Sequence, residues 1–239
     1  MKFGSSTFAK LVVTVMVASM AFGCAKKEEE EPSLGSGGLT AAQLAGTRYS
    51  SCVAVSSDAT FGAAFNGTSY MQGLTFNADG SYALSTFWFT GANCQMGGSP
   101  ILTYSQAGVF QVGEIMDTPA GATKVVMTVG VSQMTTYGGT AGASQTWAGY
   151  FNGAPGSPGF STSANDTKTV SGWQALKVTA PDFSLPTFPT TGDVLYNAVT
   201  LDTSSTKTSV TSFRQTSTIW SAGQPSSYPT TSDITFTEP

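Results

Sequence analysis

A β-hairpin at residues 70–88, YMQGLTFNADGSYALSTFW, decides the fold class of this 239-residue chain. Its centre, Asn77-Ala78-Asp79-Gly80, is typical of a three-residue loop with a G1 bulge, in which Gly80 closes a type I turn in the left-handed conformation. This turn places Asn77 opposite Ser81 and so fixes the register of both strands. One face then pairs mostly bulky side chains: Phe76 with Tyr82, Leu74 with Leu84, Gln72 with Thr86 and Tyr70 with Trp88.

This face of the hairpin is predicted to point into a core, because a slip of one residue would send its members to opposite faces. The other face is smaller and more polar, and we expect Met71, Thr75, Ala83 and Ser85 to point outward. Two interpretations of the inward aromatic residues stay open. They line a site for a small apolar ligand, or they are ordinary core. The residues concerned are Tyr70, Phe76, Tyr82 and Trp88.

Outward from the hairpin, the chain is predicted to continue as short strands separated by Gly- and Pro-rich turns. Residues 124–134 alternate, which puts Val125, Met127, Val129 and Val131 on one face. The weaker strand candidates are 108–115, 145–151, 173–178, 193–202, 207–219 and 233–237. One helix signal stands before them, with Thr40 as N-cap, Gln43 completing a capping box and Gly46 as the stop.

These patterns predict an all-β chain, because no crossover helix separates the strands. We expect an antiparallel up-and-down barrel of about 8–10 strands with a short N-terminal helix, and a β-sandwich is the alternative. Residues 39–239 are expected to form a single domain.

The N-terminal residues carry an export signal. Lys2 and Lys10 flank a polar start, an apolar run follows at residues 11–22, and small Gly23 stands directly before Cys24. This order predicts a signal peptide at residues 1–23. Residues 24–38 then form an acidic, flexible tether that contains four consecutive glutamates.

The junction at Cys24 resembles the lipobox of bacterial lipoproteins. The resemblance implies cleavage before Cys24 and acylation of its thiol, and Ala25 in place of aspartate implies the outer membrane, at its periplasmic face or the cell surface. Ala21 and Phe22 depart from the usual lipobox residues. A plain secretory peptide that is cleaved elsewhere is therefore the alternative.

Composition narrows the partners and the compartment. Loss of Lys2 and Lys10 leaves 8 basic residues against 14 acidic ones, a net charge of −6. The sequence has no basic stripe, so we do not expect nucleic acid as a partner. With Cys24 assigned to lipid, Cys52 and Cys94 remain as a pair in an oxidising compartment, so a disulfide is predicted. Two buried free thiols are the alternative.

The segment from Leu44 to Cys52, followed by the hairpin and Asn93-Cys94, resembles the opening of lipocalin-like bacterial lipoproteins. Gly46 and Thr47 fit the start of their Gly-x-Trp strand, but Arg48 stands where the tryptophan should be. Arg214 is a candidate for the late arginine that closes the barrel base in that family. The resemblance implies an eight-stranded barrel that is either filled or holds one small ligand.

Little in the sequence points to catalysis. The chain has no histidine, which removes His-based triads and the commonest zinc sites. Ser204 and Lys207 match a Ser-x-x-Lys spacing, but they lie in a Ser/Thr-rich turn without a helix signal. The carboxylates are sparse. We therefore expect no metal, no cofactor and no enzymatic activity.

Two functions remain as hypotheses. The first is a lipid-anchored envelope protein whose lipocalin-like barrel binds a small apolar ligand or maintains the envelope. The second is a cell-surface adhesion module of β-sandwich type that presents the loops of residues 138–172. Exposed aromatic loop tips, such as Trp147, Tyr150 and Phe151, would favour adhesion, and a closed barrel with an apolar cavity would favour ligand binding.

Overall fold

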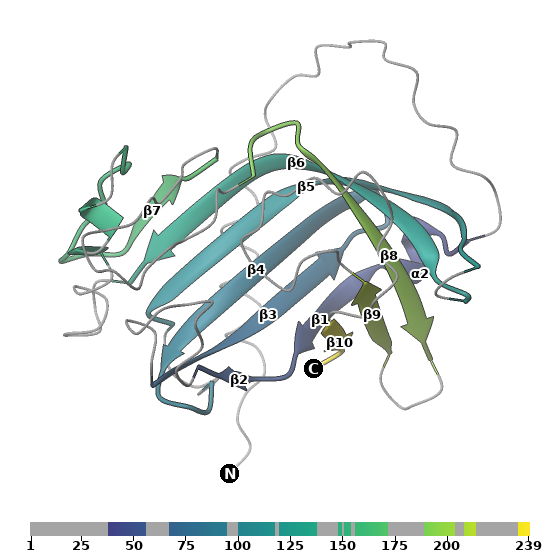
Figure 1. The fold of residues 1–239 in the computed structure, drawn as a ribbon, viewed down its shortest axis with the longest axis horizontal. Helices are drawn as coiled ribbons and strands as arrows, with labels where there is room; N and C mark the ends of the chain where they lie inside the picture. Colours follow the sequence, from purple (N-terminus) through teal and green to yellow (C-terminus); the bar gives the residue numbers. More distant parts are fainter. Residues whose placement is uncertain are drawn as a thin grey trace. The chain divides into compact units, whose positions relative to one another are not determined.

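The fold is known from a computed structural model, which describes residues 38–55, 67–94, 100–117, 120–137, 148–149, 151–153, 156–171, 189–203, 208–213 and 234–239. Within these residues, ten strands form one antiparallel sheet (Figure 1). They are β1 (Gly46–Ser50), β2 (Val53–Ala54), β3 (Thr68–Phe76), β4 (Ser81–Thr90), β5 (Leu102–Ile115), β6 (Thr123–Thr136), β7 (Asp166–Thr169), β8 (Val194–Asp202), β9 (Ser209–Phe213) and β10 (Ile234–Thr237).

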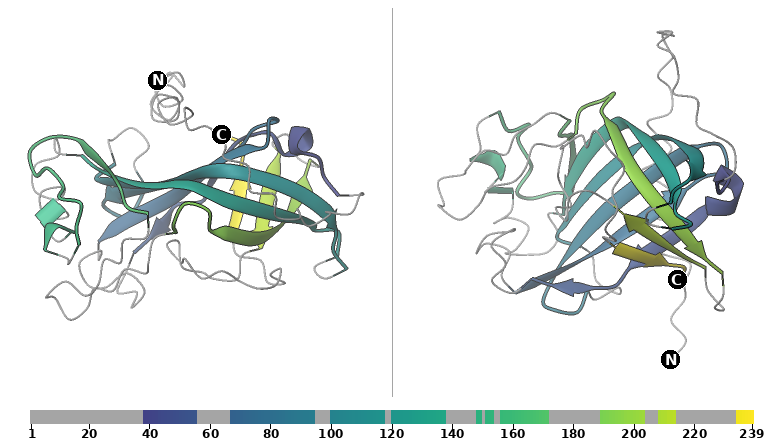
Figure 2. Two further views of the ribbon diagram at one scale, coloured as in Figure 1. Left: turned by 90° about the horizontal axis from the view of Figure 1, so that it is seen from above. Right: turned by 45° about the vertical axis from the view of Figure 1, so that its right-hand side comes forward.

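Eight of these strands close into a barrel. Neighbours pair in the order β1, β3, β4, β5, β6, β8, β9 and β10, and β10 returns to β1. The strands β8 to β10 therefore lie across the barrel from β4 and β5 (Figure 2). The predicted all-β up-and-down barrel is confirmed, and the β-sandwich alternative is wrong.

The predicted hairpin register is confirmed for every pair. Phe76 faces Tyr82 and Tyr70 faces Trp88, with the pairs between them as expected. Gly80 has φ +83°, and the Asp79 carboxylate accepts hydrogen bonds from the backbone N–H and the hydroxyl of Ser81. The turn therefore sets the register through local chemistry.

The short N-terminal helix is also present as α2 (Ala41–Leu44), with the predicted capping box. The Thr40 hydroxyl accepts from the backbone N–H of Gln43, and the Gln43 side chain accepts from the backbone N–H of Thr40. The helix lies at the barrel end that carries the Asn77–Gly80 turn, and we call this end the base.

An apolar cluster fills the base. Its buried members come from α2 and seven of the eight barrel strands, and we call them the base cluster: Leu44, Leu74, Phe76, Tyr82, Leu84, Phe110, Val125, Met127, Val199, Val210 and Phe236. Burying apolar surface stabilises a fold by about 25 cal/mol per Å². We therefore expect this cluster to be the main source of stability for the barrel.

The remaining barrel strand, β1, points Arg48 into the base beside this cluster. Its side chain is 2% exposed, and its guanidinium donates to the carbonyls of Leu44 at 2.7 Å and Ala45 at 3.4 Å. The Glu238 carboxylate lies 3.7 Å away. The arginine that replaces the expected tryptophan thus ties α2, β1 and the C-terminal residues together, whereas Arg214 lies outside the described residues.

The predicted single face of β6 is wrong beyond Gly130. The register with β5 shifts between Ala107 and Gly108, so Val125 and Met127 point inward but Val131 points outward opposite Ala107. A side chain at Gly108 would meet the Thr128 carbonyl oxygen at 2.0 Å, which shows how closely the two backbones approach at this bulge. After the shift, Ser132 takes the inward position opposite Gln106.

The outer face of the hairpin is not exposed, contrary to what its polarity suggested. Met71, Ala83 and Ser85 lie opposite the core face as predicted, but each is at most 8% exposed. Tyr49 of β1 packs on the space left by Gly73, beside Phe87. Cross-strand packing therefore covers part of this face.

The weaker strand candidates had mixed outcomes. Strands β5, β8, β9 and β10 confirm those near residues 108–115, 193–202, 207–219 and 233–237, and β5 begins six residues earlier than predicted. Within 145–151, the described residues Ala148, Gly149 and Phe151 belong to a helical turn, in which Gly153 N–H donates to the Gly149 carbonyl. The candidate at 173–178 lies outside the described residues.

Candidate functional site

The inside of the barrel changes character where the eight-stranded ring ends. Strand β8 pairs with β6 only over Thr123–Thr128 of β6. Strand β1 pairs with β3 only over the last four residues of β3, Gly73–Phe76. Strands β3 to β6 run on past this level (Figure 1). The inward residues of this continuation form what we call the upper interior, which includes Tyr70, Gln72, Thr86, Trp88, Leu102, Tyr104, Gln106, Ser132, Met134 and Thr136.

Neutral hydrogen-bonding groups form the first layer of the upper interior above the base cluster. The Gln72 carboxamide donates to the Thr86 hydroxyl at 3.2 Å, and the Gln106 carboxamide donates to the Tyr82 hydroxyl at 2.7 Å. Both glutamines are at most 4% exposed. Buried polar groups are costly unless they are hydrogen-bonded, and each carboxamide has such a partner here.

A third contact extends this layer to β6. The Tyr104 hydroxyl donates to the Ser132 hydroxyl at 3.4 Å, and Ser132 in turn donates to the Pro189 carbonyl at 3.0 Å. Ser132 is fully buried. The segment that leads into β8 therefore reaches over the upper interior at this point.

The four aromatic residues predicted as ligand contacts divide between two environments. Tyr70 and Trp88 lie together in the upper interior, with ring centroids 5.8 Å apart. Phe76 belongs to the base cluster, where its ring centroid lies 4.5 Å from that of Phe110. Tyr82 connects the two, because its ring lies in the base cluster while its hydroxyl bonds Gln106.

The upper interior is electrically neutral. Burial raises the pKa of both Tyr82 and Tyr104, so their hydroxyls stay protonated at physiological pH. Arg48 is the one charged side chain among the described buried residues. It lies in the base, where burial lowers its pKa and the Glu238 carboxylate opposes that shift.

The predicted disulfide is present at the end of the barrel that carries the upper interior. Cys52 and Cys94 are bonded, with their Cα atoms 5.7 Å apart. Cys52 directly precedes β2, whose Val53 pairs with Tyr70 of β3. The backbone N–H of Cys94 donates to the Ser69 hydroxyl at 2.8 Å. The bond therefore holds the β2 segment to the loop that follows β4.

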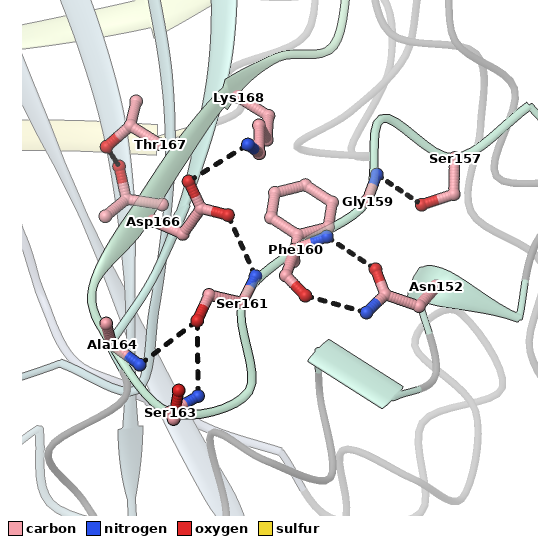
Figure 3. A network of polar contacts seen from close by, with 11 residues as sticks. Asn152, Ser157, Gly159, Phe160, Ser161, Ser163, Ala164, Asp166, Thr167 and Lys168 are labelled. Carbon is pink, nitrogen blue, oxygen red and sulfur yellow. Dashed lines mark hydrogen bonds and ion pairs between the residues drawn. The ribbon is translucent and has the colours of Figure 1, made fainter.

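A compact loop with a network of polar contacts precedes β7 (Figure 3). The Asn152 side chain donates to the Phe160 carbonyl at 2.7 Å and accepts from the Phe160 N–H at 2.6 Å. Phe151 is fully buried, with its ring centroid 5.8 Å from that of Phe160. Phe151 is thus a packing residue and not an exposed loop tip.

Asp166 of β7 stabilises the same loop. Its carboxylate accepts from the backbone N–H of Ser161 at 2.8 Å and pairs with Lys168 at 3.3 Å. Ser161 in turn accepts from the backbone N–H groups of Ser163 and Ala164. These contacts account for the polar side chains here as loop stabilisers.

Other predicted residues lie outside the described part of the chain, namely Cys24, Trp147, Tyr150, Ser204 and Lys207. Within the described part, no three His, Cys, Asp or Glu side chains gather as metal ligands. None of the helices described there has both the length and the apolar character needed to cross a bilayer.

Sequence reasoning missed the polar half of the upper interior. Gln72 was paired correctly with Thr86 but was not considered as a binding residue. Tyr104 and Gln106 were missed because the strand was expected to begin at Gly108. The alternation of Leu102, Tyr104 and Gln106 is the signal that could have found them.

Comparison with protein-family models finds no match to this sequence, and comparison with curated proteins finds no similar one. The functional argument therefore depends on the site itself.

Proposed function

We propose that this protein is a lipid-anchored, non-enzymatic envelope protein whose barrel binds one small, largely apolar ligand in the upper interior. The observation that carries the proposal is the change inside the barrel: a mainly apolar base, in which Arg48 and Asn197 are the buried polar exceptions, gives way to Tyr70 and Trp88 together with the carboxamides of Gln72 and Gln106. Ligand sites are typically apolar and aromatic, with a few placed polar groups. Barrels of eight strands are either filled by side chains or hold one small ligand.

The position of these residues also supports binding. The base cluster already supplies a core within the closed ring, so the aromatic residues of the upper interior are not needed to fill it. Tyr70 remains partly exposed, unlike Trp88 beside it. An apolar ligand that covers Tyr70 would bury further aromatic surface, which favours binding.

A dye titration tests the binding proposal. The whole chain carries Cys24→Ser for solubility, and Trp147, Trp173 and Trp220 are changed to Phe, which leaves Trp88 as the single tryptophan. N-phenyl-1-naphthylamine should bind at one site and quench Trp88 fluorescence. Dye binding that begins only in denaturant, when the barrel unfolds, would refute the proposal and identify these aromatic residues as plain core.

The anchor is tested separately. The lipobox-like junction and the acidic tether support a mature chain that begins at Cys24 and carries lipid on it. Two acyl chains give stable membrane attachment. Intact-mass spectrometry of the outer-membrane fraction should show the acylated chain, and Cys24→Ser should release it. An unmodified, soluble chain from wild-type cells would overturn this part of the proposal.

A further inference from the structure

We infer that the ligand is an uncharged amphiphile that enters the barrel with its hydroxyl or carbonyl end first. Its polar end would meet Gln106 and the Tyr82 hydroxyl, and its apolar part would lie along Tyr70 and Trp88. This inference rests on the proposed function and names the ligand class for that site.

The order of the residues along the barrel sets the orientation. The polar layer of Gln72 and Gln106 comes directly above the base cluster, and Trp88 and Leu102 lie farther from the base. A ligand that enters from the upper end therefore passes aromatic and aliphatic side chains before it reaches hydrogen-bonding groups. The Gln106 carboxamide and the Tyr82 hydroxyl, 2.7 Å apart, each have capacity to donate and to accept.

The absence of free charge sets the class. Among the described buried residues, Arg48 alone is charged, and it is already bound to the carbonyls of Leu44 and Ala45 and paired with Glu238. It lies in the base, below the polar layer. A carboxylate or an ammonium group brought to Gln106 would lose its hydration without gaining a counter-charge, which is costly for an ion.

A hydroxyl or ester group suits the same place. Neutral carboxamide and hydroxyl groups can exchange their mutual hydrogen bond for hydrogen bonds to a ligand at little net cost in free energy. A buried polar group that is left without any hydrogen-bond partner is destabilising. A site with such groups therefore discriminates in favour of ligands that carry a matching polar atom.

Three probes with one chain length test the inference: decan-1-ol, decanoate and decyltrimethylammonium, which are neutral, negative and positive at pH 7.5. Each displaces N-phenyl-1-naphthylamine from the whole Cys24→Ser chain. Decan-1-ol should compete at concentrations at least about tenfold lower than either ion, because a buried unpaired charge costs more than the roughly 1.4 kcal/mol that a tenfold ratio represents.

A matched pair of variants separates hydrogen bonding from simple partition into an apolar site. Gln106→Leu removes the inward carboxamide, and Gln133→Leu makes the same change at an outward position of β6, opposite Ser105. Gln106→Leu should weaken decan-1-ol binding about fivefold or more relative to its effect on dye binding, which is titrated directly on the same variant, since one hydrogen bond is worth about 1 kcal/mol. Gln133→Leu should change neither.

The outcomes distinguish the two proposals. If the folded wild-type chain binds neither dye nor any probe, the proposed function fails and this inference fails with it. If the dye binds at one site but an ion competes as well as decan-1-ol, or Gln106→Leu leaves decan-1-ol unaffected, only the ligand class is overturned. The wild-type series decides the question even where Gln106→Leu does not fold.

Discussion

Replacing Leu84 by alanine tests whether the hairpin face that Gly80 registers is the core face. Leu84 is 9% exposed and lies opposite Leu74 within the base cluster. The change removes three carbon atoms, worth about 2.4 kcal/mol at about 0.8 kcal/mol for each buried group. The cavity left behind adds to this, so the free energy of unfolding should fall by about 3–4 kcal/mol.

The neighbouring residue provides the comparison. Ser85 lies on the outer face, and its hydroxyl bonds that of Ser105 at 3.0 Å. Ser85→Ala therefore loses one hydrogen bond, and we expect a cost of about 1 kcal/mol. Because Ser85 is only 8% exposed, Ser85→Ala should lower the free energy of unfolding more than Val109→Ala, a substitution at a residue that is 57% exposed.

Urea unfolding measures the three variants. With an m-value of about 2 kcal/mol/M, Leu84→Ala should lower the midpoint by about 1.5–2 M and Ser85→Ala by about 0.5 M. Val109→Ala should stay within about 0.5 kcal/mol of wild type. Equal shifts for Leu84→Ala and Ser85→Ala, at unchanged m-values, would show that the two faces are assigned wrongly.

The same titration checks three further expectations. Arg48→Ala should lower the free energy of unfolding by about 3 kcal/mol, because it removes a buried charge that donates to two carbonyls. Glu238→Gln should lower it by less than about 1 kcal/mol, because Glu238 is 39% exposed. A larger loss for Glu238→Gln than for Arg48→Ala would contradict this assignment. Reducing the Cys52–Cys94 bond, which spans 42 residues, should cost about 4 kcal/mol, and two alkylatable thiols in the native protein would disprove the bond. Burial raises the pKa of Tyr82 above that of the unfolded chain, where tyrosine ionises at about pH 10. The neutral Tyr82 hydroxyl therefore contributes fully to the free energy of unfolding below about pH 10, and this contribution is lost as the pH rises above that value. Tyr82→Phe should therefore reduce the loss of stability between about pH 8 and about pH 11, and an unchanged alkaline loss would refute the assignment.

Local chemistry explains which parts of this fold were predictable. The hairpin register follows from one turn, because Gly80 accepts a positive φ and Asp79 accepts from the Ser81 N–H within the same loop. The capping box of α2 is equally local, with Thr40 and Gln43 three residues apart. Both could be derived from adjacent residues alone.

Long-range contacts explain what was not predictable. The bulge at Gly108 depends on how closely the β6 backbone approaches, so the inward position of Ser132 could not be inferred from the alternation before Gly130. Arg48 looked like a departure from a family pattern. Its burial beside the base cluster depends on barrel closure, which also brings Glu238 within 3.7 Å of its guanidinium.

The candidate site was hidden for a different physical reason. Gln106 looks like a solvent-facing residue, because a sequence pattern ranks glutamine as polar and polar residues are mostly exposed, whereas the hairpin register already placed Gln72 on the inward face. Only its pairing with Leu84 on the same inner face reveals that Gln106 is buried. A buried carboxamide departs from the apolar pattern of a core, as Asn197 also does in the base, where it donates to the Met127 sulfur.

This violation of the pattern is itself an argument for function. The base shows that the chain can fill most of a barrel level with apolar residues, and replacing a hydrogen-bonded buried pair by well-shaped apolar groups is often neutral or stabilising. Stability therefore does not require Gln106 and Tyr104 to be polar. Departures from local consistency concentrate at functional positions, where strands extend beyond the part of the fold that secures stability. In this barrel, that is the level at which the eight-stranded ring ends and the upper interior begins.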